Sequence, residues 1–119
     1  MKPCEYPGCS SMGQQHHIVF RSQGGMNIDI NYAYLCPAHH TGTKAAVHNN
    51  REFDLRLKRN MQEELFKKFT DNEYTIEQIS KIIGYDKRRL DKRFRKVRQK
   101  AGIFLKEDII RELMGGRLY

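Results

Sequence analysis

Cys4-Glu-Tyr-Pro-Gly-Cys9 holds two thiols on either side of a Pro-Gly turn, and Cys36-Pro-Ala-His39 supplies a second pair of ligand-type side chains. A tight turn directs both sulfur atoms toward one point, as a tetrahedral ion requires. Three thiolates and one imidazole predict a closed structural Zn²⁺ site made of Cys4, Cys9, Cys36 and His39. Such an ion would supply folding energy that a small N-terminal core lacks. The alternative is that the three cysteines are reduced thiols used as small core residues.

Metal-ligand residues and positive charge lie in different parts of the sequence. All three cysteines and all five histidines precede residue 49, whereas residues 86–100 carry nine Lys/Arg against two acids, a net charge of +7. The whole chain of 119 residues has 22 basic and 14 acidic residues, a net charge of +8. A basic surplus of this size in a small chain favours a polyanionic partner, with nucleic acid the first candidate.

The same composition argues against several classes of protein. No apolar run approaches the ~18–20 residues that span a bilayer, so we expect no membrane partner. The first residues have no apolar stretch after Lys2, so we expect no secretory signal and a cytoplasmic location. Three cysteines cannot all pair, which argues against a disulfide framework.

The first part of the chain is predicted to mix loops, strands and a helix. Residues 1–15 are rich in Gly, Pro, Ser and Gln and are predicted to form a knuckle or loop. Two β-prone runs, Ile18–Phe20 and Tyr32–Leu35, are predicted to be short strands. Apolar side chains then recur every four residues from about Asn50 to Phe69, which predicts an amphipathic helix.

A break at Asp71-Asn72 is predicted to separate two modules, residues 1–72 and residues 73–119. The expected fold class is α+β, with a small zinc-bound module followed by an α-helical one. The second module should end in a short helix from roughly Glu107 to Met114. It is marginal alone, so we expect it to dock on the 50–70 helix or to form a dimer.

The second module has the layout of a helix-turn-helix. A capping box at Thr75 and Gln78 is predicted to open a short helix that ends at Gly84. A longer helix is predicted from Asp86, its cap, to Gly102. This second helix would lie against DNA, and most of its basic side chains would contact the backbone rather than read bases.

The basic side chains predicted to contact nucleic acid lie outside the apolar stripe of this second helix. They are Lys87, Arg88, Arg89, Lys92, Arg93, Arg95, Lys96 and Arg98. Binding through so many cations should weaken steeply with salt. The alternative is a solvated charged helix that only keeps the chain soluble.

The order of motifs in the first half resembles the HNH endonuclease family, in the zinc-knuckle form common among phage and restriction nucleases. The matching pieces are the two knuckle pairs, His16-His17-Ile18 followed by Arg-Ser-x-Gly-Gly, Asn31 before Leu35-Cys36, His40, and Gly42…Val47-His48-Asn49. The resemblance covers roughly residues 1–65. It implies a treble-clef-like ββα-metal nuclease, in which two short strands and a helix hold one catalytic metal.

The resemblance also implies a role for each residue of the motif. His17 would be the general base that takes a proton from water, a task suited to an imidazole with a pKa of ~6.5. His16 and His40 would be ligands of the catalytic metal, and His48 is the candidate third ligand. Asn31 would brace the loop and orient His17 through its carbonyl. Because adjacent strand residues point to opposite sides, His16 can face the metal while His17 faces the water.

The sequence departs from the family pattern in its ligands. The second knuckle pair is Cys-His, which leaves His39 and His40 as alternatives for the fourth zinc ligand, and a spacing of two residues favours His39. Many relatives have an acid in place of His16, and a histidine-rich set suits Mn²⁺, Ni²⁺, Co²⁺ or Zn²⁺ as much as Mg²⁺. Asn49 or a water are the substitutes for His48. Arg21 is placed to hold a backbone phosphate.

The resemblance implies a metal-dependent endonuclease that cuts double-stranded DNA to a 5′-phosphate and a 3′-hydroxyl. It further implies a phage setting, hence the host cytoplasm, and packaging or restriction-type partners. Nicking and double-strand cleavage both stay open, since a lone site cuts both strands only through a homodimer or a second event. The alternative function is a non-catalytic zinc-containing helix-turn-helix regulator with structural histidines. Composition does not separate RNA from DNA.

Overall fold

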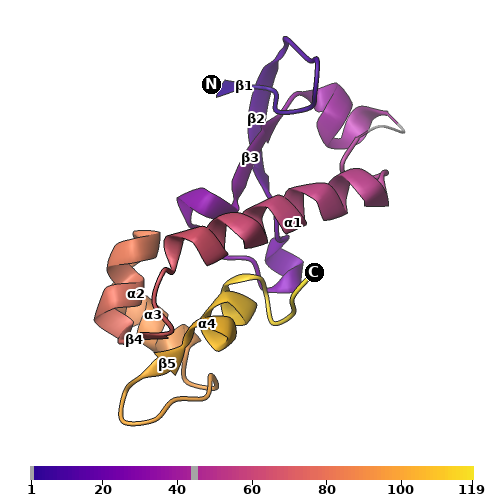
Figure 1. Ribbon diagram of the computed structural model, residues 1–119. Coiled ribbons are helices and arrows are strands. Elements are labelled where there is room, and N and C mark those ends of the chain that lie inside the picture. The colour runs from indigo at the N-terminus through magenta and orange to yellow at the C-terminus, as the bar shows by residue number, and fades with distance from the viewer. Residues whose placement is uncertain (1, 44–45) are drawn as a thin grey trace.

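A three-stranded antiparallel sheet in the order β1-β2-β3 and a long helix, α1, make up the first half of the α+β fold. The computed structural model describes residues 2–43 and 46–119. In Figure 1, α1 crosses the middle of the molecule, with the sheet on one side and the smaller helices and the β4–β5 pair on the other. The strands are β1 (Lys2–Pro3), β2 (Met12–His17), β3 (Tyr32–Leu35), β4 (Glu73–Tyr74) and β5 (Phe104–Leu105), and the α-helices are α1 (Arg51–Lys68), α2 (Ile76–Ile83), α3 (Lys87–Arg93) and α4 (Lys106–Leu113).

The β2–β3 hairpin differs in part from the sequence prediction. The strand predicted at Tyr32–Leu35 is confirmed, and His16 and His17 of β2 pair with Ala33 and Tyr32. The strand predicted at Ile18–Phe20 is wrong, because β2 ends at His17. The Val19 N–H then donates to the Asn31 side chain and not to a neighbouring strand. Met12–Gln15, predicted to be loop, form the start of β2.

The helix predicted from about Asn50 to Phe69 is confirmed as α1. The Asn50 side chain accepts a hydrogen bond of 3.2 Å from the Phe53 backbone N–H, which caps the helix. Its buried face includes Phe53, Met61 and Leu65 of the predicted apolar period and also a charged residue, Lys58, which is 1% exposed. The Lys58 ammonium lies 2.6 Å from a carboxylate oxygen of Asp54, one turn earlier, so the buried charge is paired.

The helix caps predicted for the start of residues 73–119 are confirmed. The capping box of Thr75 and Gln78 opens α2, which ends at Gly84 with φ +66°. Asp86 accepts a hydrogen bond of 3.0 Å from the Arg89 N–H at the start of α3. The last predicted helix is also confirmed, as α4.

The predicted length of the second helix is wrong, since α3 ends at Arg93 rather than near Gly102. Phe94 is 1% exposed and packs edge-on against Phe104, with the ring centroids 5.4 Å apart. Burying this aromatic pair takes the chain off the helical path. The basic residues from Arg95 onward therefore lie in a loop and not on a helix face.

Both halves of the chain contribute to one hydrophobic cluster. Val19 and Met26 of the β2–β3 connection lie in the same cluster as Leu65 of α1 and Ile109 and Leu113 of α4. The second half therefore packs on the β2–β3 connection as well as on α1. Among the residues described, no helix is long and apolar enough to cross a membrane.

A close approach of two chain segments fixes this packing. Gly115 has φ +86°, and a Cβ built on it would lie 2.2 Å from the carbonyl oxygen of Gln23. Only glycine fits this backbone contact, because any other residue would push the segments apart.

Candidate metal centres

The four side chains of the predicted zinc knuckle come together. Nδ1 of His39 lies 3.5 Å from the Cys4 sulfur and 3.2 Å from the Cys36 sulfur, and the Cys36 and Cys9 sulfurs are 3.8 Å apart. A zinc ion with Zn–S bonds of about 2.3 Å sets neighbouring sulfurs about 3.8 Å apart in a tetrahedron. The donor set and its spacing therefore fit a tetrahedral metal ion such as zinc.

The surroundings of the knuckle hold its ligands in place. The Tyr6 ring stacks on the His39 ring at 3.9 Å and meets Phe53 of α1 edge-on at 5.0 Å, so it fixes the plane of the imidazole. Burial raises the pKa of the Cys4 thiol, whereas a hydrogen bond from the Ser11 backbone N–H lowers the pKa of Cys9. A bound cation would favour the thiolate at both positions.

A second cluster consists of His16, His40 and His48. Their ring centroids are 5.0 Å (His16–His40), 5.3 Å (His16–His48) and 4.8 Å (His40–His48) apart. One nitrogen of each ring lies within 4.8 Å of the other two, which suits a shared metal ion. The three rings come from β2, from the turn after β3 and from the segment before α1, so the site exists only in the folded chain.

The turn after β3 separates the two adjacent histidines. Both backbone N–H groups donate to the Cys36 carbonyl, His39 at 3.0 Å and His40 at 2.8 Å, within a π-helical turn over Ala38–Gly42. Neighbouring residues on a helical turn point in different directions. The structure accordingly places His39 with the cysteines and His40 with His16 and His48.

His16 is the buried member of the second cluster. It is 3% exposed, and its Nε2 atom has no hydrogen-bond partner among the described residues. Burial, followed by the neighbouring His40 and His48, lowers the pKa of His16 to about 3, and burial also lowers the pKa of His40. A buried polar nitrogen without a partner costs about 1–3 kcal/mol, a loss that a coordinated ion would offset. His48 is exposed, so the cluster is open to solvent on that side.

Two residues that pack next to the three-histidine cluster, Phe20 and Lys58, were not predicted from the sequence. The Phe20 ring lies 5.6 Å from His16 and 5.0 Å from His48, and the Lys58 ammonium sits 4.4 Å from the centre of that ring. One signal could have indicated Lys58, because it lies three residues before Met61 and seven before Leu65, on the apolar face of the predicted helix. The position of Phe20 depends on the chain path after β2, which no local pattern predicts.

His17 lies beside this cluster and its ring is held by Asn27. His17 Nε2 is 2.8 Å from Asn27 Oδ1, and the ring meets Tyr32 edge-on at 5.1 Å. Since Oδ1 can only accept, Nε2 carries the hydrogen in this pair and Nδ1 is left to accept a proton. The expectation that Asn31 orients His17 through its carbonyl is not matched by a hydrogen bond among the described residues. The His17 ring bonds to Asn27, whereas the Asn31 backbone carbonyl accepts from the Ile18 N–H at 2.8 Å.

Asn31 is fully buried and ties the β2–β3 connection together. Its Oδ1 accepts a hydrogen bond of 2.8 Å from the Val19 N–H. Its amide donates to the carbonyls of Val19 at 3.1 Å and Met26 at 2.9 Å. These three bonds brace the loop that carries Phe20 and Arg21.

Most of the predicted nucleic-acid contacts lie on the surface. The exposed members are Arg21, Lys87, Arg88, Arg89, Lys92, Arg95, Lys96 and Arg98. Two of them form ion pairs, Lys87 with the exposed Glu77 at 2.9 Å and Arg98 with the largely buried Asp108 at 3.1 Å. Arg93 differs, because its guanidinium is bound to Glu112 and to the backbone of the β2–β3 connection. The structure therefore places Arg93 in an internal contact rather than on a nucleic-acid-facing surface.

Comparison of the chain with family profiles, with curated proteins and with solved structures finds no match. The class of protein is therefore defined by the geometry alone. It is a small α+β protein with two clusters of side chains suited to metal ions, one of Cys and His and one of His only.

Proposed function

We propose that this protein is a metal-dependent endonuclease of the HNH type that hydrolyses phosphodiester bonds in double-stranded DNA. The observation that carries the proposal is the meeting of His16, His40 and His48 beside His17, which is held separately by Asn27. One ligand of the three-histidine cluster, His16, and a proton acceptor, His17, thus lie on adjacent residues of β2. The treble-clef-like description of residues 1–72 and the helix-turn-helix description of α2 and α3 belong to the same proposal.

His16, His40 and His48 fit a divalent ion because all three are imidazoles, the innermost is neutral, and its Nε2 lacks another partner. When bound, an ion such as Mg²⁺, Mn²⁺, Ni²⁺ or Zn²⁺ offsets the negative charge that develops on the phosphoryl and leaving oxygens. The knuckle of Cys4, Cys9, Cys36 and His39 would hold a separate structural Zn²⁺.

The chain's own residues supply the proton chemistry. Nδ1 of His17 accepts a proton from the attacking water, and the hydrogen bond from Nε2 to Asn27 holds the ring in one orientation. Arg21 is exposed on the turn after Phe20, where its guanidinium can hold a phosphate of the bound strand.

The experiment is incubation of supercoiled plasmid with the protein, with and without Mn²⁺ or Mg²⁺, beside the His17→Ala variant. We expect metal-dependent relaxed or linear DNA, lost in His17→Ala while zinc content and DNA binding persist. Gln14→Ala, an exposed change on the same strand, is the matched control and should cut normally. Open circles alone would mean nicking, and linear DNA would indicate a homodimer or a second cleavage event.

Two results would overturn the proposal. One is a His17→Ala variant that cuts as fast as the wild type. The other is a salt-sensitive gel shift without cleavage by any metal, which would favour the non-catalytic regulator instead. The unpartnered nitrogen of His16 argues against that alternative, because a purely structural histidine would be hydrogen-bonded.

A further inference from the structure

A basic loop of residues 95–103, here named the basic hairpin, joins α3 to β5. Its two ends are fixed, because Phe94 before it and Phe104 after it are buried and pack against each other. Between these anchors the chain is exposed except at the half-buried Val97 and Ile103. It carries four cations and no acid, namely Arg95, Lys96, Arg98 and Lys100.

The tip of the basic hairpin is a defined turn. The N–H of Lys100 donates to the Ile103 carbonyl and the N–H of Ile103 donates to the Lys100 carbonyl, both at 3.0 Å. Ala101 and Gly102 between them have φ of +52° and +78°, as in a two-residue type I′ turn. Among the described residues Ala101 is the one non-glycine with a positive φ, a sterically disfavoured state that is typical of functional sites.

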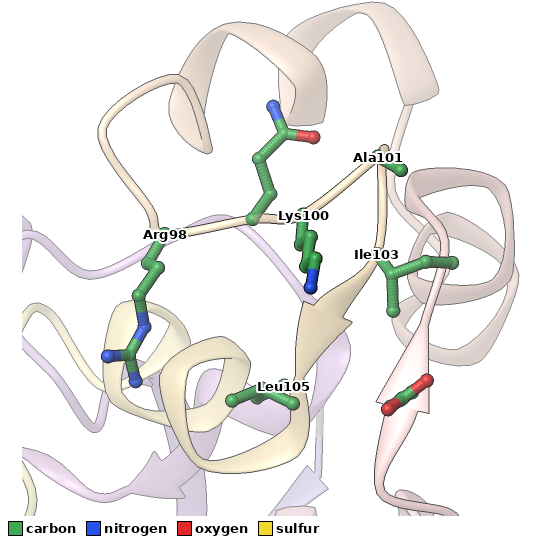
Figure 2. Close-up of a pocket in the computed structure, with 7 residues that line it drawn as sticks. Arg98, Lys100, Ala101, Ile103 and Leu105 are labelled. Atoms are coloured by element: carbon green, nitrogen blue, oxygen red, sulfur yellow. The ribbon is translucent and has the colours of Figure 1, made fainter.

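A hollow of about 710 Å³ lies between the basic hairpin and the β4–β5 pair. Figure 2 shows the side chains of Arg98 and Lys100 extending from the hairpin toward the end of the hollow where Leu105 lies. Ile103 and Leu105 give the hollow an apolar face, and Leu105 is 44% exposed. The one carboxylate that lines the hollow is Glu73.

We propose that the basic hairpin and its hollow form a second nucleic-acid contact, which holds the sugar-phosphate backbone of duplex DNA beside α3. Arg98 and Lys100 match phosphate oxygens, and the apolar face of Ile103 and Leu105 matches deoxyribose. The carboxylate of Glu73 repels phosphate from its side of the hollow, so the phosphates would lie near Arg98 and Lys100. Arg98 donates to Asp108 through Nε and Nη2, but its own side chain is 77% exposed, and a guanidinium has five N–H donors, so it can bind a phosphate as well. The inference rests on the proposed function only in taking DNA as the partner.

The test measures binding of a fluorescent duplex DNA of about 24 base pairs to the full-length protein by anisotropy, between ~50 and ~200 mM salt. The variant Arg98→Gln/Lys100→Gln removes the two cations, and Arg98→Lys/Lys100→Arg keeps the charge. Lys67→Gln/Lys68→Gln, at the exposed end of α1, is the control for the same loss of net charge. Thermal melting confirms that each variant is folded.

We expect the neutral hairpin variant to reduce the slope of log K against log salt by about 1.8, since each phosphate contact contributes about 0.9. Over the fourfold salt range the wild type should lose about twelvefold more affinity than this variant. The charge-keeping variant should behave like the wild type, and the α1 control should keep the wild-type slope.

Equal slopes for the hairpin variant and the α1 control would overturn the proposal. Stronger and more hairpin-dependent binding of a duplex RNA of the same sequence would overturn the choice of DNA. Metal-dependent cleavage by the wild type, together with a wild-type salt slope in Arg98→Gln/Lys100→Gln, would leave the nuclease proposal intact and refute the hairpin contact. A reduced salt slope in Arg98→Gln/Lys100→Gln, without cleavage by the wild type, would support the hairpin contact and refute the nuclease proposal.

Discussion

The guanidinium of Arg93 donates a hydrogen bond to the backbone carbonyl of Gly24, 69 residues earlier in the chain. Its Nε donates to Glu112 of α4 at 2.8 Å, so the side chain is held from both directions. Gly24 lies in the connection between β2 and β3 that also carries Phe20, the ring beside His16 and His48. One side chain of the basic helix α3 thus holds the chain segment that also carries Phe20.

Replacing Arg93 by alanine should therefore destabilise the fold by about 1–2 kcal/mol, since a charged hydrogen bond is lost and its partners are left without it. Urea unfolding followed by circular dichroism measures the change. Arg95→Ala, an exposed neighbour, is the matched control and should shift stability by no more than about 0.5 kcal/mol. Equal effects of the two substitutions would mean that the contact of Arg93 with Gly24 contributes nothing.

The adjacent histidines His39 and His40 should respond in different ways to the same change. His39→Ala removes a ligand of the Cys/His knuckle, so we expect loss of the bound structural metal and unfolding of the first part of the chain. His40→Ala should keep that metal and the melting temperature, but lose plasmid cleavage. Metal analysis of dialysed protein and a thermal melt separate the two outcomes.

The same loss of metal from both histidine variants would refute the separation of the two sites. Retention of structural metal by His39→Ala, with its loss from His40→Ala, would exchange their assignments. The test is direct because the two residues share one turn and the substitutions remove the same atoms.

Acid should weaken the fold through His16. The pKa of this group is about 3 in the folded chain against an ordinary value of 6.5, chiefly because it is buried. Between these values the unfolded chain binds a proton that the folded chain does not, so stability falls as the pH drops below 6.5. The loss should reach about 2 kcal/mol by about pH 5. A bound metal would not change the sign, because ligation also needs a neutral imidazole.

Melting temperatures measured across this pH range test the prediction. His16→Asn should flatten the dependence, and His48→Asn, at the exposed side of the cluster, is the control that should flatten it less. Identical pH dependence in the wild type and His16→Asn would show that His16 is not the group responsible.

Local patterns were enough to predict the elements whose signals lie within a few residues. The capping box of Thr75 and Gln78, the cap at Asp86 and the four-residue apolar period of α1 all match the structure. The knuckle was predictable for a similar reason, because its Cys and His ligands come as two close pairs. Spacing also separated His39 from His40, since the pair that begins at Cys36 needs a ligand three residues later.

The features that sequence analysis missed depend on contacts between distant segments. The end of α3 is set by the packing of Phe94 on Phe104, and Arg93 turns inward because Glu112 and Gly24 lie next to it. The role of Asn27 was missed because Asn31 matched the family pattern, whereas hydrogen bonding alone distinguishes the two.

Asn27 is the residue on which the orientation of His17 depends, so its loss should slow cleavage without weakening DNA binding. We expect Asn27→Ala to lower the single-turnover rate by about 10–100-fold, the cost found for residues that orient metal-binding histidines. The Kd for duplex DNA and the melting temperature should stay near wild type, because Asn27 is exposed. Asn60→Ala, an exposed asparagine on α1, is the matched control. A wild-type rate in Asn27→Ala would mean that its hydrogen bond does not hold the base, whereas a raised Kd with an unchanged rate would make Asn27 a binding residue instead.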